Sequence, residues 1–415
     1  MPAMNPDRMV ALVTRHRRRL PRWVNRAIDY VADNPDGIVG RIVTRRFGQI
    51  ADADVPEPVR PTRDATATVL IGAQNYAGQA RAWSQALGDH TPGWWAANIA
   101  KDVPGGFGFD ADRVIPLAAY HNSHTWQVQQ FEAAREFDHV IIEGAEAIFG
   151  RLLGRDVTRE ISALRDSGVD VSVLFHGTDI RLPSRHAQAT RWSPFAQADH
   201  HDRLERKAAR NAQIVTDLRV RTFVSTPDLL ADLPEAIWLP VVVDVDRYSV
   251  EREEASDHLR VMHVPSNPVV KGTHLIAEPM RRLAAHGLVS YQQLMGVPSS
   301  KMPSIYAAND VVLDQFRLGI YGVAACEAMA AGCVVVSHVA DAVRATVRER
   351  VGMELPIVEA TPETIDDVLA TLAADPQVRR EVADRGREFV SAIHSGARSA
   401  AILSEALGSG PKGAR

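Results

Sequence analysis

Two short stretches of the 415-residue chain place polar side chains beside glycines in a way that suits an anionic ligand. In the first, Lys271 and Gly272 begin a helical pattern after an apolar run. In the second, Gly322 opens an alanine-rich helical pattern whose one acid is Glu327. The free N–H groups of a helix start and a nearby ammonium group both favour a phosphate. These stretches therefore predict a phosphate site, or else a plain strand–helix unit with Glu327 on its exposed face.

A third stretch places polar residues directly after an apolar run, Val169–Phe175, that predicts a buried strand. His176, Asp179 and Arg181 follow it. In open parallel sheets ligands bind beyond the carboxyl ends of the strands, so these side chains are candidates for a binding site. The alternatives are a structural His176, an Asp179 that caps the next helix, and an Asp179 that pairs with Arg181.

The elements around these stretches alternate between strand and helix, which predicts an α/β fold with parallel sheets. Gly72 and Gly78 are too far apart for the glycine fingerprint of a dinucleotide fold, which disfavours an NAD-dependent dehydrogenase. The expected strands are short apolar runs bounded by polar residues or glycine: Thr66–Ala73, Arg113–Leu117, His139–Gly144, Val169–Phe175, Arg260–Val264, Val289–Pro298, Val311–Leu313 and Cys333–Val336.

Length and shifts in composition divide the chain into two α/β domains. Residues 65–245 are expected to form the first and residues 258–395 the second, with a charged linker at about 243–257. Residues 1–64 precede them as a helical extension that ends in a proline-rich linker, and residues 396–415 follow as a helix and tail. Arg15–Val31 is a basic amphipathic stretch whose short apolar face favours packing on the protein over contact with an anionic membrane surface.

The composition is that of a globular enzyme, with 46% hydrophobic and 24% charged residues. A net charge of −4 gives no argument for nucleic-acid binding. The two cysteines, Cys326 and Cys333, are too few for a disulfide scaffold or a zinc site, and they indicate a reducing cytoplasm. No apolar run is long enough to span a membrane. His186, His200 and His201 follow no zinc spacing, so no metal site is expected.

The stretch Asp310–Ser337 resembles the nucleotide-sugar site of retaining glycosyltransferases of the GT-B fold and of the family 4 type. Their motif runs Glu, two residues, Gly, four residues, Glu-Ala-Met-Ala, two residues and Pro-Val, and YGVAACEAMAAGCVVV matches it from the glycine onward. The resemblance implies that the backbone at Gly322 and Val323 meets a diphosphate and that Glu327 binds the ribose hydroxyls. Gly319 stands where the family has its first Glu, the usual partner of the donor sugar.

A related set of bacterial surface-polysaccharide transferases resembles this variant more closely. They have Asp-Gln and Gly-x-Tyr-Gly at the places of Asp314, Gln315, Gly319, Tyr321 and Gly322. They also have a string like the His-Gly-Thr-Asp-x-Arg of this chain, which implies acceptor or sugar contacts for His176, Asp179 and Arg181. The resemblance extends to the remaining candidates: Lys271 and Gly272 for the diphosphate, Ser266 where the family has an Arg, Gly296 and Val297 against the nucleobase, and Gly78 and Gln79 near donor phosphate and acceptor.

The fold that the resemblance implies is a pair of Rossmann-like domains facing each other across a cleft. The activity it implies is transfer of a hexose from a nucleotide diphosphate sugar to a hydroxyl acceptor, with retention of configuration. The nucleotide sugar is then a co-substrate, and neither a bound metal nor another cofactor is expected. His176 and Lys271 are the candidates for catalysis.

The expected setting is assembly of a polysaccharide or lipid-linked glycan, in the cytoplasm or at the inner membrane face through Arg15–Val31. A small-molecule acceptor stays open, as do the nucleobase, the sugar and the oligomeric state. One alternative is a nucleotide-sugar-binding partner subunit without turnover, which Gly319 in the usual Glu position favours. The other is a nucleotide-sugar epimerase on the same fold.

Overall fold

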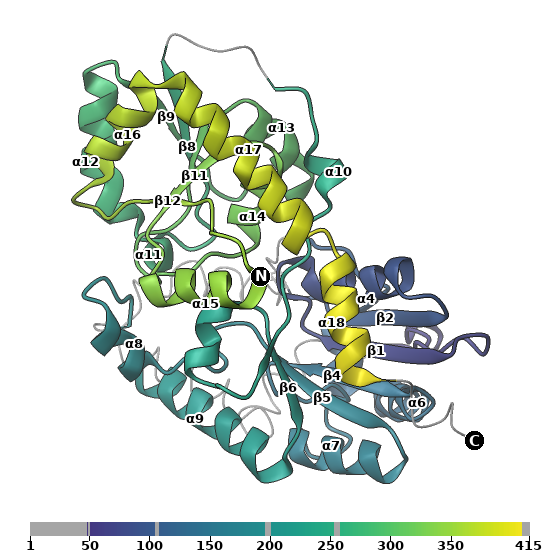
Figure 1. The fold of residues 1–415 in the computed structure, drawn as a ribbon. Helices are drawn as coiled ribbons and strands as arrows, with labels where there is room; N and C mark the ends of the chain where they lie inside the picture. The colour runs from purple at the N-terminus through teal and green to yellow at the C-terminus, as the bar shows by residue number, and fades with distance from the viewer. Residues whose placement is uncertain (1–47, 49, 104–107, 196–200, 253–257, 409–415) are drawn as a thin grey trace, which may run out of the picture.

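The computed structural model describes residues 48, 50–103, 108–195, 201–252 and 258–408. They form two lobes, each built on a parallel β-sheet with helices packed against it, and the chain passes between the lobes twice (Figure 1). The expectations for Arg15–Val31, for His200 and for the tail after residue 408 fall outside the described residues.

The N-terminal lobe is organised on a parallel sheet whose seven described strands have the order β3-β2-β1-β4-β5-β6-β7. The order reverses between β1 and β4, which opens a crevice beyond the carboxyl ends of these two strands. The strands are β1 Ala67–Ala73, β2 Trp94–Lys101, β3 Arg113–Ile115, β4 His139–Glu143, β5 Asp170–Phe175, β6 Arg221–Val224 and β7 Ile237–Trp238. The helices are η2 Asp52–Asp54, η3 Tyr76–Gly78, α4 Gln79–His90, α5 Leu117–Asn122, α6 His124–Ala134, α7 Val157–Asp166, α8 Pro183–Ala189, α9 His201–Leu218 and η4 Pro227–Ala231.

The C-terminal lobe repeats this plan with a parallel sheet whose five described strands have the order β12-β11-β10-β8-β9. Here the order reverses between β8 and β10, and a second crevice is expected at that point. The strands are β8 Leu259–His263, β9 Val289–Gln293, β10 Val311–Leu313, β11 Val334–Ser337 and β12 Val358–Glu359. The helices are α11 Pro268–Lys271, α12 Thr273–Ala285, η5 Ser299–Lys301, α13 Met302–Ala307, α14 Val323–Ala330, α15 Asp341–Val351, α16 Ile365–Ala374 and α17 Pro376–Ile393.

The central strands are the core of both lobes because their apolar side chains are covered on both faces. Every residue of β1, β4, β10 and β11 is buried. Such near-continuous runs of Val, Ile and Leu are typical of parallel strands between helical layers. One hydrophobic cluster extends from Val69 in β1 to Met329 in α14, so apolar packing continues from one lobe to the other.

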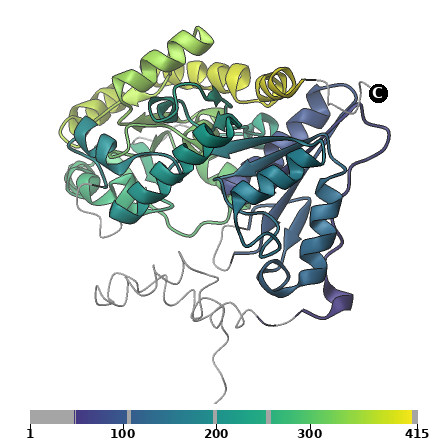
Figure 2. The same ribbon diagram turned by 90° about the horizontal axis from the view of Figure 1, so that it is seen from below.

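Two crossings join the lobes and are tied to each other. The first runs from β7 to the short helix α10, Val245–Tyr248, and the second leads from α17 to α18, Ala397–Leu407. The N–H of Val243 donates to the carbonyl oxygen of His394 over 2.8 Å, and Nδ1 of His394 lies 2.7 Å from the carbonyl oxygen of Val241. Helix α18 packs on α4 of the N-terminal lobe, and Figures 1 and 2 show α17 and α18 passing from one lobe to the other.

The predicted α/β fold class is confirmed, whereas some boundaries differ. Strand β2 was not predicted, and its residues Trp94–Lys101 lie between β1 and β3. The strand expected over Val289–Pro298 ends at Gln293, and Gly296 beyond it has the left-handed φ of +67°. Helix α10 lies inside the segment expected to be a linker, residues 243–257.

The position of Lys271 was also predicted incorrectly. It does not begin the long helix but ends the one-turn helix α11, and α12 begins at Thr273. Gly272 separates the two helices with φ +80°, a left-handed conformation that an α-helix cannot contain.

Candidate functional site

The crevice of the C-terminal sheet brings together the ends of β8 and β10, which are neighbours in the sheet. Lys271 lies in the loop region after β8, and Asp314 directly follows β10. The Nζ atom of Lys271 is 2.5 Å from Oδ1 of Asp314, and the side chain of Asp314 is 4% exposed. The other oxygen of Asp314, Oδ2, is buried without a hydrogen-bond partner among the described residues. The carboxylate therefore holds the ammonium group at the point where the strand order reverses.

The helix α14 begins at Val323, at the end of the loop that continues from Asp314. The backbone N–H groups of its first residues, Val323 and Ala324, have no acceptor within the helix. Gly322 is the residue before the helix, with φ −148° and ψ −162°, and a Cβ atom added to it would meet nothing within 4 Å. The fold itself therefore does not require glycine at 322, and the missing side chain leaves open space over the helix N-terminus.

Glu327 lies in the same helix, α14, next to the crossing helix α10. Burial raises the pKa of the Glu327 carboxyl, while the Tyr248 hydroxyl and the Arg247 guanidinium act in the opposite direction. The hydroxyl of Tyr248 is close enough to exert this effect, but it makes no well-aligned hydrogen bond within the described residues. Glu327 therefore lies near the phenol of Tyr248, and its carboxylate retains capacity to accept hydrogen bonds.

Two further candidates of this loop have structural contacts. Tyr321 is 1% exposed, and its hydroxyl lies 3.5 Å from Nε2 of His394 in the second crossing. The side-chain amide of Gln315 donates to the carbonyl oxygen of Ile320 over 2.5 Å, which closes the loop on itself. A donor contact at Tyr321 would therefore have to come from its backbone, since its side chain is packed against the crossing.

Gly319 lies at the interface between the lobes. Its φ is +65°, and a Cβ atom there would approach the Cβ of Ala340 to 3.3 Å. It lines a pocket of about 340 Å³ to which the N-terminal lobe contributes Arg181, His186 and Asp228. The structure therefore brings Arg181 and Gly319, predicted on separate motifs, to one pocket.

The remaining donor candidates lie in loops that follow β8 and β9. Ser266 is exposed in the first of these loops, just before the cap of α11. Gly296 is exposed in the second, whereas Val297 packs against the hydrophobic core. The nucleobase contact assigned to Gly296 and Val297 stays a prediction.

The crevice of the N-terminal sheet places His176, at the end of β5, beside Glu143, the last residue of β4. The Nε2 atom of His176 is 3.1 Å from Oε1 of Glu143, whose side chain is fully buried. The other oxygen, Oε2, accepts hydrogen bonds from the N–H groups of Gln74 and Asn75 over 2.8 and 2.9 Å. The ring of Tyr76 meets the imidazole edge-on at 4.9 Å. Glu143 thus connects the loop after β1 to His176.

Asp179 and Arg181 do not pair with each other, so that alternative was wrong. The Asp179 carboxylate accepts from the N–H groups of His176 and Gly177, at 2.7 to 3.1 Å, and so closes the loop after β5. The Arg181 guanidinium instead binds Asp228 of η4 with two hydrogen bonds of 2.7 and 3.1 Å. Asp179 therefore holds His176 in place, and Arg181 reaches the pocket between the lobes.

The loop after β1 presents Gly78 and Gln79 as predicted neighbours of an acceptor. Gly78 has φ +74° and precedes α4. The amide of Gln79 is buried and makes two hydrogen bonds with the backbone of Val242, donating to its carbonyl over 3.0 Å and accepting from its N–H over 2.7 Å. The Gln79 side chain therefore fixes the first crossing, and an acceptor contact in this loop would have to come from other atoms.

Three residues of the two crevices were not chosen as site candidates: Tyr76, Glu143 and Asp314, although Asp314 belongs to the motif on which the resemblance rests. Glu143 and Asp314 follow or end apolar strands, so the rule that selected His176 would also have selected them. Tyr76 gave no such signal. Its ring is 43% exposed, and it lies next to His176 because η3 turns the loop after β1 toward β5.

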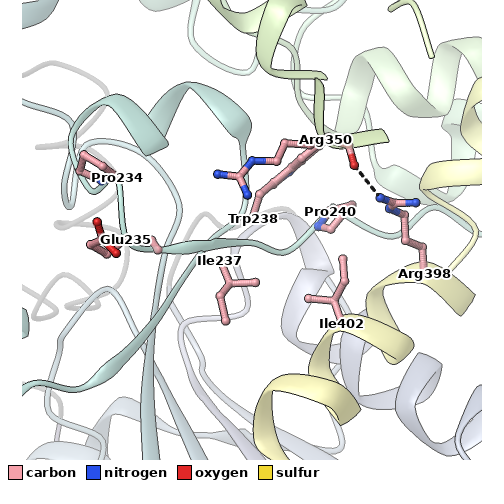
Figure 3. A pocket seen from close by; sticks show the side chains of 9 residues that line it. Pro234, Glu235, Ile237, Trp238, Pro240, Arg350, Arg398 and Ile402 are labelled. Carbon is pink, nitrogen blue, oxygen red and sulfur yellow. Dashed lines mark hydrogen bonds between the residues drawn. The ribbon is translucent and has the colours of Figure 1, made fainter. Parts of the chain in front are cut away.

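A second hollow, of about 410 Å³, lies on the side of the crossings where β7, the end of α15 and α18 meet (Figure 3). Arg398 donates a hydrogen bond of 3.1 Å to the carbonyl oxygen of Arg350 across it. Trp238 forms part of its wall. None of the predicted site residues lines this hollow.

Within the described part of the chain, no group of three or more His, Cys, Asp or Glu side chains is arranged to hold a metal ion. The described helices include none with the length and apolar character needed to cross a bilayer.

The comparisons with known proteins identify the fold. No protein-family model matches the chain, and no curated protein sequence matches it. Among solved structures, sucrose-phosphate synthase from Thermosynechococcus elongatus is similar at 15% identity and a TM-score of 0.54, over 82% of this chain and 97% of that chain. The catalytic domain of starch synthase IV from Arabidopsis thaliana, bound to ADP and acarbose, is similar at 11% identity and a TM-score of 0.51, over 83% of this chain and 99% of that one. The chain therefore has the GT-B fold, two Rossmann-like domains that face each other.

Proposed function

We propose that this protein is a glycosyltransferase that uses a nucleotide diphosphate sugar as donor and a hydroxyl group as acceptor. The transfer proceeds with retention of configuration and without a bound metal ion, as the resemblance of residues 310–337 implies. The observation that carries the proposal is the position of Lys271 and Asp314 at the point where the strand order of the C-terminal sheet reverses. Ligands of open α/β sheets bind at such points.

The chemical task that this site suits is stabilisation of the leaving group. Negative charge grows on the diphosphate as the bond between sugar and phosphate breaks. The Lys271 ammonium and the free N–H groups of Val323 and Ala324 are preorganised donors for that charge. Gly322 leaves space for the phosphate oxygens to approach these groups, and Asp314 keeps Lys271 in position. Glu327 supplies acceptor atoms for the ribose hydroxyls.

The N-terminal crevice supplies the acceptor side. The backbone of His176 is held by Asp179, and its Nε2 atom lies 3.1 Å from the carboxylate of Glu143. It contacts a hydroxyl of the acceptor or of the donor sugar, while the departing phosphate takes the acceptor proton. The setting that we propose is glycan assembly in the cytoplasm or at its membrane face.

A turnover assay distinguishes a glycosyltransferase from an epimerase and from a binding subunit without activity. The protein is incubated with UDP-, GDP-, dTDP- and ADP-linked hexoses and a pool of candidate acceptors, and release of free nucleoside diphosphate is followed. Release that depends on the acceptor, with a product of unchanged anomeric configuration by NMR, supports the proposal. A product of inverted configuration would refute retention, and conversion of the donor into its epimer would support the epimerase.

A second candidate is a nucleotide-sugar-binding subunit without turnover, which Gly319 favours. The φ of +65° and the contact with Ala340 leave no unstrained place for the family's Glu at this position. Tight binding of one nucleoside diphosphate, with no release from the matching nucleotide sugar under any acceptor, would establish that candidate instead.

A further inference from the structure

A cluster of cationic side chains lies beside the N-terminal crevice. Lys101 is the last residue of β2, Lys207 belongs to α9, and Glu146 lies between them in the loop after β4. The Nζ atom of Lys101 is 3.4 Å from Oε2 of Glu146, and that of Lys207 is 2.8 Å from Oε1. The three residues come from separate segments that meet at the carboxyl edge of the sheet. We name them the Lys101–Lys207 cluster.

The two ammonium groups of this cluster share one carboxylate at ion-pair distance, and the more distant carboxylate of Glu143 also acts on Lys101. In the described part of the chain, Glu146 is the one carboxylate within ion-pair distance of Lys101 or of Lys207. The Lys101 side chain is only 13% exposed, and burial lowers the pKa of its ammonium group. Burial alone would raise the pKa of Glu146, but the two lysines hold it below its usual value. An anion that reached both lysines would accept hydrogen bonds from two ammonium groups that share a single carboxylate at ion-pair distance.

Further cationic side chains lie close to the cluster. Lys101 and Arg155 lie over the ring of Tyr120, at 5.1 and 5.8 Å from its centroid. The guanidinium of Arg155 is 2.7 Å from Nδ1 of His121, which must accept the hydrogen bond and so be deprotonated there. Burial, together with Arg155, Lys101 and Arg151, lowers the pKa of His121 to about 3. A neutral histidine among cations shows that this part of the crevice disfavours further positive charge.

The cluster is joined to His176 through one residue of the loop after β1. The side-chain amide of Gln74 donates to Glu146, and its backbone N–H donates to Glu143, the partner of His176. Tyr76, which meets the His176 ring, experiences the charges of both Glu146 and Glu143. An acceptor whose hydroxyl lies at His176 would thus have its other end next to Lys101 and Lys207.

We propose that the Lys101–Lys207 cluster binds an anionic group of the acceptor, a phosphate or a carboxylate. This inference rests on the proposed function and names the class of acceptor. The protein then discriminates acidic acceptors from neutral ones by the cluster, while the donor diphosphate is bound by the other lobe. The two anion sites are separate, and each is removed by a substitution that leaves the other site in place.

The test measures equilibrium binding of glucose 6-phosphate and glucuronate by calorimetry, with glucose as the uncharged match. The variants are Lys207→Gln, Glu146→Gln and, for the donor site, Lys271→Gln. Lys207 is 37% exposed on a helix, so its substitution is compatible with folding, which circular dichroism checks. We expect Lys207→Gln to weaken binding of an acidic probe about tenfold, the scale of one charge-assisted contact. Glu146→Gln removes the carboxylate that competes with the probe, so it should strengthen binding of an acidic probe.

The outcomes separate this inference from the proposed function. Loss of acidic-probe binding in Lys207→Gln but not in Lys271→Gln, with the reverse pattern for nucleoside diphosphates, supports both. The inference is overturned if the acidic probes do not bind or bind no better than glucose. It is also overturned if their binding is unchanged in Lys207→Gln and Glu146→Gln. If nucleoside diphosphates still bind through Lys271 in that case, the proposed function stands without it. Failure of every variant and of the wild type to bind a nucleoside diphosphate refutes the function itself.

Discussion

Single residues in both crevices are held by contacts that fix their orientation before a ligand arrives. Asp314 holds Lys271, Asp179 holds the backbone of His176, and the Glu143 carboxylate lies 3.1 Å from Nε2 of the His176 ring. Fixed donors and acceptors stabilise a transition state better than mobile ones, because no reorganisation is needed during the reaction. The orienting residues are therefore as informative for mutagenesis as the groups they orient.

Glu143→Gln tests this orientation at the N-terminal crevice. The amide oxygen can still accept from Gln74 and Asn75, but the amide nitrogen no longer offers His176 Nε2 a carboxylate. We expect the transfer rate to fall by up to roughly a hundredfold, since a displacement of about 1 Å near reacting atoms has that cost. Binding of the nucleoside diphosphate should be unchanged. A transfer rate equal to that of the wild type would show that Glu143 only fastens the loop after β1.

Which side chains matter was only partly readable from the sequence. The strand-end rule found His176, Asp179 and Arg181, but their partners were not evident. Arg181 pairs with Asp228, which is 47 positions away in the chain. Such a contact depends on how η4 packs beside the loop after β5, and no local pattern encodes it. Asp314 and Glu143 carried the signal and were passed over.

At the scale of elements, the start of α14 is the feature most directly linked to function. Val311–Leu313, Val323–Ala330 and Val334–Ser337 form the strand, helix and strand that the sequence predicted, because apolar runs and glycines mark their ends. The start of α12 was predicted incorrectly, because a single turn of helix ahead of Gly272 carries no periodicity that a sequence can display. Long regular elements are thus predictable, whereas one-turn helices and two-residue strands are not.

Gly322→Ala separates the role of this helix start in folding from its role in binding. Alanine adopts φ −148° without strain, and its Cβ would meet no protein atom within 4 Å. We therefore expect the free energy of unfolding to change by less than about 1 kcal/mol. The methyl group occupies the space over Val323 N–H, so affinity for the nucleoside diphosphate should fall at least tenfold. Unchanged affinity would remove this helix start from the site.

The junction of the two crossings predicts a pH dependence of stability. His394 is buried, and burial lowers its pKa to about 4, below the value of about 6.5 in an unfolded chain. Between these values the unfolded chain binds a proton that the folded protein does not, so stability is lost as the pH falls from 6.5 towards 4. The loss from this group alone is on the order of 3 kcal/mol.

His394→Gln should reduce that pH dependence, because glutamine can donate to the Val241 carbonyl and does not titrate. Denaturant midpoints of the wild type and the variant are measured from pH 7 to pH 4. The difference in denaturant midpoint between the wild type and the variant should become smaller as the pH falls. A constant difference across this range would contradict the assignment to His394 and leave the other buried histidines as the cause.

At the scale of the whole molecule, the lobes are held together by contacts besides the crossings. The Arg317 guanidinium, in the loop after β10, donates to the carbonyl oxygens of Trp192 and Ser193 over 2.7 Å each. The Nε2 atom of His186 lies 3.0 Å from the carbonyl oxygen of Leu318. These bonds join α8 and the segment after it to the loop that also carries Gly319. The two-lobed plan was predictable from the sequence. The hydrogen bonds of Arg317 and His186 between the lobes, called the latch below, were not, because their acceptors are backbone carbonyls.

Arg317→Ala tests whether this latch sets the distance between the lobes. Loss of the two bonds across the interface should shift the population to a more open arrangement, seen as a larger radius of gyration in small-angle X-ray scattering. Arg191→Ala is the matched control, since Arg191 also bridges the lobes, to Glu363, but is 71% exposed. Exposed ion pairs contribute little, about 0–1 kcal/mol, so this control should leave the radius unchanged. Equal radii for all three proteins would show that the crossings alone hold the lobes.

The central claim is that the C-terminal crevice binds a nucleoside diphosphate through Lys271. It is tested most directly by calorimetric titration of UDP, GDP, dTDP and ADP into the wild type and Lys271→Gln. Arg348→Gln, which makes the same charge change on the exposed face of α15, is the control. We predict that one diphosphate binds tightly to the wild type and to Arg348→Gln, and at least tenfold more weakly to Lys271→Gln. Binding of none of the four to the folded wild type, or equal binding to Lys271→Gln, would contradict the account.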